Sequence, residues 1–322
     1  MSKSCWLFLI LLIALILASI FIGRYPLPRP IFQAWQDQLF INLLTKIRIP
    51  RIISAVLVGI SLSISGLIMQ TIFKNPLADP GILGVSQASG FGAALGIILG
   101  GGITFWVQVS SFAFALIALL LVILISKRIK GLQKLSLVLA GIAVSAVFSA
   151  GLGVLKYLAD PIDQLPSIVY WLLGSLANST WDSITRTLLI TVPLILFFWF
   201  YRWRLNIHAV DQKVAFSLGL KNNFEVYFVL ICSVLLTSSI IAISGIVGWI
   251  GLIVPNFSRI MISSDTHKSM PIVITIGGIF SLICDNLSRS LIPGEIPIGI
   301  FTAFLGSLFF IFLLLDKRKK LV

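Results

Sequence analysis

Residues 103–126 read ITFWVQVSSFAFALIALLLVILIS, an apolar run without a charged side chain. As a helix, a run of eighteen or more such residues is long enough to cross about 30 Å of hydrocarbon. Similar runs recur along the 322-residue chain, in which 58% of residues are hydrophobic and only 11% are charged. We therefore expect an all-α polytopic membrane protein that forms a single transmembrane domain over residues 1–322.

The apolar pattern predicts ten helices. One segment, residues 250–263, is too short to cross a bilayer alone, and we expect it to penetrate only part of the way. The ten predicted helices are residues 6–23, 52–73, 82–100, 103–126, 135–158, 184–201, 226–248, 250–263, 271–288 and 297–315.

The basic residues indicate how these helices are oriented, because cytoplasmic loops of membrane proteins carry an excess of Lys and Arg. With the N-terminus inside and ten crossings, sixteen of the 24 basic residues fall in cytoplasmic segments and eight fall outside. We therefore predict that both termini are cytoplasmic. Three of the outer residues, Arg48, Arg51 and Arg289, lie at predicted membrane edges, and these exceptions suggest a function.

Composition also excludes some classes of protein. The net charge of +13 could suggest nucleic-acid binding, but such a surface gathers Lys and Arg on one solvated face, whereas here they lie in short loops between apolar runs. The cysteines, Cys5, Cys232 and Cys284, are scattered and predict neither a disulfide framework nor a metal site. We expect no nucleic-acid partner, no cofactor and no bound metal ion.

Several predicted helices are rich in small and hydroxyl side chains. Small residues let helices pack closely in a membrane, where no hydrophobic force drives them together. The same faces could instead line a passage for a bulky solute, and the sequence leaves both interpretations open. The candidate pathway residues are Ser61, Ser65, Gln70, Asn75, Ser145 and Ser149.

Three stretches are too specific to be generic membrane sequence. In the first, the prolines Pro76 and Pro80 predict a bend, because proline cannot continue a helix. The second lies in a long basic loop, and the third follows it towards the C-terminus. They read RIPR at 48–51 with KNPLADPGILG at 74–84; LNI at 205–207 with AFSLG at 215–219; and SGIVGWIGLIVPN at 244–256 with DNLSR at 285–289, EIPIG at 295–299 and LG at 305–306.

In this order and at these spacings, the three stretches closely resemble the FecCD-type permeases, the membrane subunits of ABC importers for ferric siderophores, haem and cobalamin. The resemblance covers residues 46–315. It implies a ten-helix subunit of a bacterial or archaeal cytoplasmic membrane, surrounded by lipid, that pairs with a second permease subunit, most simply as a homodimer. It also implies two cytoplasmic ATPase subunits and an external substrate-binding protein as partners.

The resemblance implies roles for two groups of residues. Arg48, Arg51 and Arg289 match arginines that dock the binding protein in this family, and we expect them to form a basic collar on the outer face. The cytoplasmic loop 207–221 matches the segment that couples to the ATPase. The coupling residues are Asp211, Gln212, Ala215, Leu218 and Gly219.

The chain departs from the family pattern at Gln212, in the reduced acidic run before the AxxLG motif, at Asn256, where a histidine is usual, and at Ser307, where a proline is usual. Residues 165–175, LPSIVYWLLGS, are similar to the branch that includes molybdate-type oxyanion importers. We favour a metal chelate as substrate, ferric siderophore or haem, with a molybdate or tungstate oxyanion and cobalamin as alternatives.

Other classes of function fit less well. The chain has no GxxxxGK[ST] phosphate loop, so an ATP-driven transporter would need a separate ATPase subunit. An ion-coupled secondary transporter usually carries acidic residues or histidines well inside its helices. This class is disfavoured because almost no charge lies mid-membrane, where Asp285, near the outer end of residues 271–288, is the main candidate, and because no inverted repeat is visible. A membrane enzyme is disfavoured because His208 and His267 lack HExxH spacing and no nucleophile and base pair is apparent.

Overall fold

The computed structural model describes residues 3–23, 37–129, 133–210, 214, 217, 223–292 and 294–315. Its regular elements are helices, so the all-α prediction is confirmed for this part of the chain. They are α1 (Lys3–Phe21), α2 (Gln38–Leu43), a π turn (Leu44–Arg48), α3 (Ile49–Phe73), a 3-10 turn (Pro80–Leu83), α4 (Val85–Leu99), α5 (Thr104–Arg128), α6 (Gln133–Leu158), α7 (Gln164–Leu172), α8 (Trp181–Ala209), α10 (Asn223–Ser244), α11 (Ile250–Met261), α12 (Thr266–Ser290) and α13 (Ile298–Leu315).

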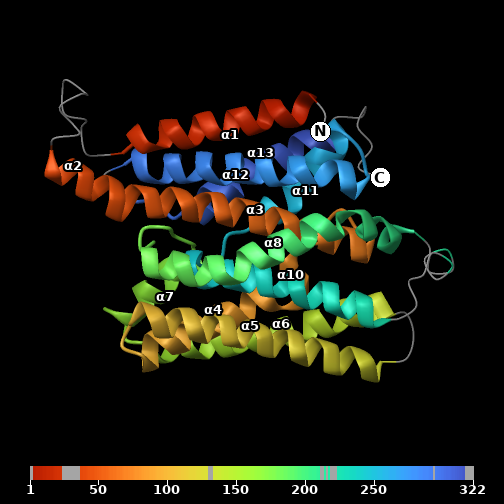
Figure 1. Cartoon of the computed structure of the whole chain (residues 1–322). Coiled ribbons are helices and arrows are strands. Elements are labelled where there is room, and N and C mark those ends of the chain that lie inside the picture. Colours follow the sequence, from red (N-terminus) through yellow and green to blue (C-terminus); the bar gives the residue numbers. More distant parts are fainter. Residues whose placement is uncertain are drawn as a thin grey trace.

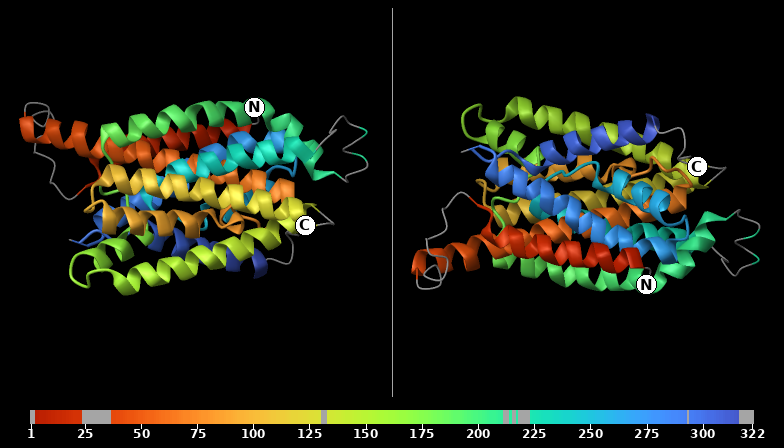
Figure 2. Two further views of the ribbon diagram at one scale, coloured as in Figure 1. Left: turned by 90° about the horizontal axis from the view of Figure 1, so that it is seen from below. Right: turned by 90° about the horizontal axis from the view of Figure 1, so that it is seen from above.

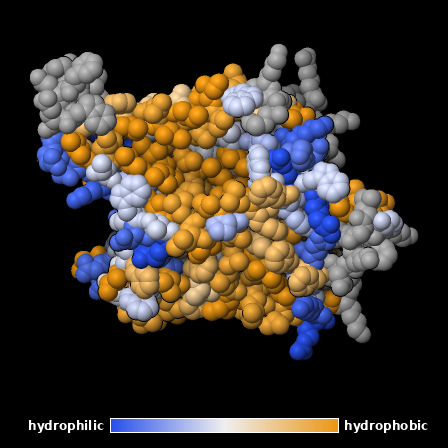
Figure 3. Space-filling view, in the orientation of Figure 1, coloured by the Kyte–Doolittle hydropathy of each residue, from blue (hydrophilic) through white to orange (hydrophobic). Residues whose placement is uncertain are grey.

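The helices lie side by side in one bundle, and the two termini lie towards the same end of it (Figures 1 and 2). The space-filling view shows an apolar belt between two hydrophilic ends (Figure 3). Six helical stretches of the described chain are long and apolar enough to cross a membrane, and α1, α4, α11 and α13 contain shorter apolar helices. Each of the ten predicted segments overlaps one helix of the structure.

The second predicted helix begins much earlier than expected. The chain is helical without a break from Gln38 to Phe73, because a π turn joins α2 to α3. Charged residues and Pro50 made this stretch resemble a loop. Proline is tolerated here because Pro50 directly follows the π turn, where the regular hydrogen-bond pattern of the α-helix is already interrupted. The added turns project from the end of the bundle opposite the termini (Figure 1).

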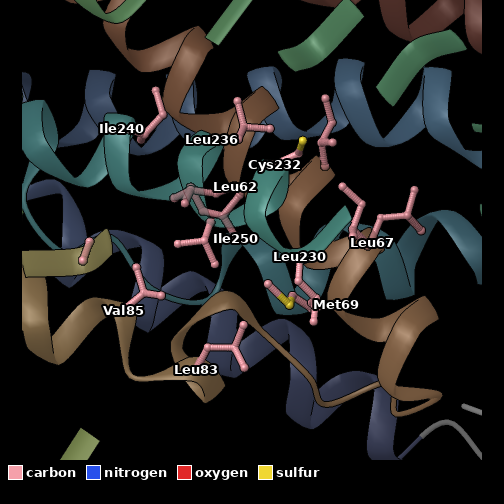
Figure 4. Close-up of a cluster of buried hydrophobic side chains, with 14 of the residues drawn as sticks. Leu62, Leu67, Met69, Leu83, Val85, Leu230, Cys232, Leu236, Ile240 and Ile250 are labelled. Atoms are coloured by element: carbon pink, nitrogen blue, oxygen red, sulfur yellow. The ribbon is translucent and has the colours of Figure 1, made fainter. Parts of the chain in front are cut away.

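Helix α3 forms the centre of the bundle, and almost all of its residues are buried. Its apolar side chains meet those of α10 and α11 and of the turn before α4 (Figure 4). Glycines allow this close packing: a Cβ at Gly59 would lie 2.0 Å from the carbonyl oxygen of Gly277 on α12, and one at Gly66 would lie 1.9 Å from that of Gly251 on α11. Gly59 and Gly66 therefore serve helix packing.

Two irregular segments interrupt the helices. The chain bends between Phe73 and Val85, as the prolines predicted, with Lys74 and Gly84 in left-handed conformations. Between α10 and α11, Gly245 and Trp249 also have positive φ angles. Helix α11 is only 12 residues long, about 18 Å, as expected for a segment too short to cross a bilayer.

Candidate docking, pathway and pocket residues

Three predicted docking arginines come together at the end of the bundle opposite the termini. Arg48 and Arg51 lie where the π turn joins α3, and Arg289 lies in the last turn of α12. Two carboxylates, Asp285 and Glu295, lie among them. We call these five residues the ion-pair cluster.

Arg51 is the centre of this cluster. Its Nε donates to Asp285 Oδ1 at 2.7 Å, and its Nη1 donates to both carboxylate oxygens of Glu295 at 2.8 Å. Arg289 Nε lies 3.6 Å from the second oxygen of Asp285. The Asp285 side chain is fully buried, whereas that of Glu295 is 29% exposed. Asp285, the predicted intramembrane charge, is thus neutralised by arginines of two helices.

The other two arginines, Arg48 and Arg289, cap the C-terminal end of α1. Arg289 Nη2 donates to the carbonyl oxygen of Ser19, and Arg48 Nη1 donates to that of Ile20, both at 2.8 Å. The last carbonyl groups of a helix lack partners within the helix, so cationic donors stabilise them. The cluster thereby ties α1 to α3 and α12.

The arrangement differs from the exposed basic collar that the sequence suggested. Arg48, Arg51 and Arg289 are only 5–6% exposed. The cluster contains three guanidinium groups and two carboxylates, so it carries one excess positive charge. Burial is possible because carboxylates and helix carbonyls, most of them distant in sequence, replace water around the guanidinium groups.

The predicted pathway residues fall into two groups. Ser61, Ser65 and Gln70 are buried in α3. Ser65 donates to the Ser233 carbonyl oxygen of α10 at 3.2 Å, and Gln70 donates to the Gly251 carbonyl oxygen of α11 at 3.2 Å. Their environment corresponds to the packing alternative that the sequence left open.

The other pathway residues are accessible. Asn75 is exposed in the bend after α3, where its side chain accepts a hydrogen bond from the Leu77 N–H at 2.9 Å. On α6, Ser145 is partly buried and Ser149 is exposed. These three residues have surfaces that a solute or a second subunit could contact.

Asn256, one of the departures from the family pattern, joins α11 to the bend after α3. Its Nδ2 donates to the carbonyl oxygens of Pro76 and Leu252, both at 2.8 Å, and its Oδ1 accepts from Arg259 at 2.8 Å. In the same bend, burial raises the pKa of Asp79, although backbone N–H groups partly oppose this effect. The side-chain amide of Asn256 therefore makes a structural contact that any replacement of Asn256 must reproduce.

A pocket of about 420 Å³ lies beside α7, a short helix that the apolar pattern did not predict. Its lining is neutral and includes hydroxyl, amide and aromatic side chains from α5, α7, the connection between α7 and α8, and the end of α10: Thr104, Gln108, Ser167, Tyr170, Trp171, Asn178 and Ser244. Two motifs of the sequence reach this pocket, LPSIVYWLLGS at 165–175 and the start of SGIVGWIGLIVPN at 244–256. The coupling residues Asp211, Gln212, Ala215, Leu218 and Gly219 lie outside the described residues.

Comparison with known proteins gives matches over nearly the whole chain. The profile of the FecCD transport family matches residues 11–316. The molybdate import system permease protein of Haemophilus influenzae is 37% identical over 310 residues, covering 92% of this chain and 91% of the relative. The hemin transport system permease protein of Yersinia pestis is 32% identical over 319 residues, and the match covers 97% of this chain and 95% of the relative. A solved metal-chelate type ABC transporter in an inward-facing conformation superposes with a TM-score of 0.89 at 35% identity, covering 96% of this chain and 97% of that chain.

Proposed function

Because the chain belongs to the FecCD transport family, and is therefore a multi-pass permease of an ABC importer in the inner membrane, we propose that it imports a metal chelate, a ferric siderophore or haem. The superposition on a metal-chelate type transporter over 96% of the chain carries this proposal. An oxyanion such as molybdate is the second candidate, since a molybdate permease is 37% identical. Cobalamin remains the third.

The partners follow from the family. An ABC ATPase supplies the energy and an external binding protein supplies the substrate, so the permease needs no catalytic activity of its own. We propose two ATPase subunits and a homodimer of this chain, with the loop 207–221 as the coupling segment within the single domain 1–322. We place the pathway along Ser145 and Ser149 of α6 because Ser61, Ser65 and Gln70 are enclosed by neighbouring helices.

Reconstitution tests this function directly. Vesicles containing the permease, its ATPase and its binding protein are expected to accumulate a labelled ferric siderophore or haem only when ATP is supplied. Molybdate and cobalamin are offered in parallel, and accumulation of either instead would reassign the substrate. Uptake driven by a proton or sodium gradient without ATP would exclude the importer mechanism.

The end of the bundle with the termini is proposed as the cytoplasmic end. Two single cysteines test this in a background without native cysteines. One replaces Leu77, which is 52% exposed in the bend after α3, and the other replaces Tyr157, which is 88% exposed at the C-terminal end of α6. Leu77→Cys is expected to react with a membrane-impermeant thiol reagent only from the cytoplasm, and Tyr157→Cys only from outside. Reaction of Leu77→Cys from outside would invert the topology.

In the same series of single-cysteine variants, a bulky thiol reagent attached to Ser149→Cys is expected to block uptake, because Ser149 lies on the proposed pathway.

Docking of the binding protein is proposed at the end that holds the ion-pair cluster. Because the three arginines are buried and partly neutralised, we expect them to act through their excess positive charge rather than by direct contact along a collar. Charges near an interface act mainly on the association rate and its dependence on salt.

Two variants that change the net charge of the ion-pair cluster in opposite directions check this proposal. Glu295→Gln removes a partly exposed negative charge and is expected to speed association with an acidic binding-protein surface, whereas Arg48→Gln is expected to slow it. Each change should be up to about fivefold at low salt, since such charges contribute about 0 to 1 kcal/mol. Association rates measured at two ionic strengths give the answer. Equal rates for both variants would remove the docking role.

A further inference from the structure

The last nine residues of α8 carry side chains to which the roles above assign no task. The Tyr201 hydroxyl donates to Glu225 Oε1, in the first turn of α10, at 2.6 Å. Arg204 Nε donates to the same oxygen, and Arg204 Nη2 donates to Oε2 at 3.2 Å. One carboxylate of α10 therefore holds two side chains of α8.

The same end of α8 is also bonded to the start of α12. Asn206 Nδ2 donates to Asp265 Oδ1 at 2.7 Å, and the Thr266 N–H donates to Asn206 Oδ1 at 2.8 Å. Asp265 is the N-cap of α12, where its side chain accepts from the His267 N–H. Asn206 is thus fixed through both its donor and its acceptor to a helix end that is itself capped.

These contacts enclose both ends of one chain segment. Arg204 and Asn206 precede the end of α8 at Ala209, and Glu225 follows the start of α10 at Asn223. The residues between the two helices include most of the proposed coupling loop. A loop can transmit a movement only if its ends do not shift to absorb it, so rigid supports are needed at both ends.

We propose that Tyr201, Arg204 and Asn206, with Glu225 and the N-terminus of α12, form a clamp that positions the coupling loop against the ATPase. They are positioning residues for the coupling of ATP hydrolysis to transport. This proposal rests on the proposed assignment of loop 207–221. The Arg204 side chain is 42% exposed, so breaking its pair with Glu225 leaves a charge that water can solvate, and the subunit should still fold.

The first test measures the spacing of the loop ends without any transport assay. Spin labels are attached at Val210→Cys and Phe224→Cys, two exposed positions next to the end of α8 and at the start of α10, after the native cysteines have been replaced. In the otherwise native subunit we expect a narrow distribution of distances between the labels. With Glu225→Ala, the distribution is expected to broaden while the thermal unfolding temperature stays close to that of the parent.

The second test measures coupling in the complete transporter reconstituted with its ATPase and binding protein. Glu225→Ala and Asn206→Ala are each expected to lower the number of substrate molecules imported per ATP hydrolysed by about fivefold or more, the usual range of coupling between sites. Arg186→Gln, which changes an arginine at the opposite end of α8, is the matched control and should leave the ratio unchanged. The exchanged pair Arg204→Glu with Glu225→Arg should restore part of the coupling.

Gly219→Val separates failure of the clamp from failure of the loop assignment, because a β-branched residue is excluded from backbone conformations that glycine adopts freely. If Gly219→Val uncouples but Glu225→Ala changes neither the distances nor the ratio, the clamp is overturned and the loop assignment stands. If Gly219→Val also leaves the ratio unchanged, the loop assignment itself fails.

Discussion

Replacing Asp285 with asparagine is expected to lower the free energy of unfolding of the isolated subunit by about 3 to 5 kcal/mol, because removing one partner of a buried ion pair leaves the other charge uncompensated. Asp285 is fully buried between Arg51 of α3, at 2.7 Å, and Arg289 of α12, at 3.6 Å. Asparagine keeps the volume but removes the negative charge. The excess positive charge of the ion-pair cluster rises from one to two, and α1, α3 and α12 lose a shared centre.

Glu295→Gln is the matched control for this experiment. It makes the same carboxylate-to-amide change next to the same Arg51, but its side chain is 29% exposed and water can compensate. Thermal unfolding of both variants in detergent measures the difference. The smaller loss is expected for Glu295→Gln, and equal losses would show that burial of Asp285 does not determine its contribution.

Gly66→Ala is expected to be the second most damaging change, with a loss of about 3 kcal/mol or more, because it overpacks a contact between two backbones. A Cβ at Gly66 would lie 1.9 Å from the Gly251 carbonyl oxygen, and no rotation of a side chain can relieve contact with a backbone atom. Helices α3 and α11 must separate, which also strains the hydrogen bond from Gln70 to the same carbonyl.

Gly153→Ala provides the control for the added methyl group. Gly153 lies on α6, and beyond its chain neighbours and the backbone of its own helix no atom lies within 4 Å of a Cβ built there. Since alanine favours helix by up to about 1 kcal/mol over glycine, this variant should be as stable as the parent or slightly more stable. Unfolding temperatures of the two variants in the same detergent decide the matter. If Gly66→Ala matches Gly153→Ala, α3 and α11 do not pack as closely as described.

Much of this protein could be predicted from local sequence. Apolar runs long enough to span a bilayer predict helices without reference to anything else in the chain, because each backbone group bonds within its own helix. The bend at Pro76 and Pro80 follows from the geometry of proline alone. The motif order was sufficient to indicate the FecCD-type family. The helical stretch from Gln38 was missed because its charged residues find buried partners only in the folded chain.

Only the tertiary structure decided what the polar residues do. Arg51 and Asp285 are 234 positions apart, and nothing near either residue shows that they pair. The hydroxyl of Ser65 could equally have faced a passage or a neighbouring helix, and in the folded chain it donates to the Ser233 carbonyl oxygen of α10. Charge and polarity acquire a role from what surrounds them, and these surroundings come from distant segments. The sequence determined the membrane helices, whereas packing between helices determined which arginines and serines are enclosed.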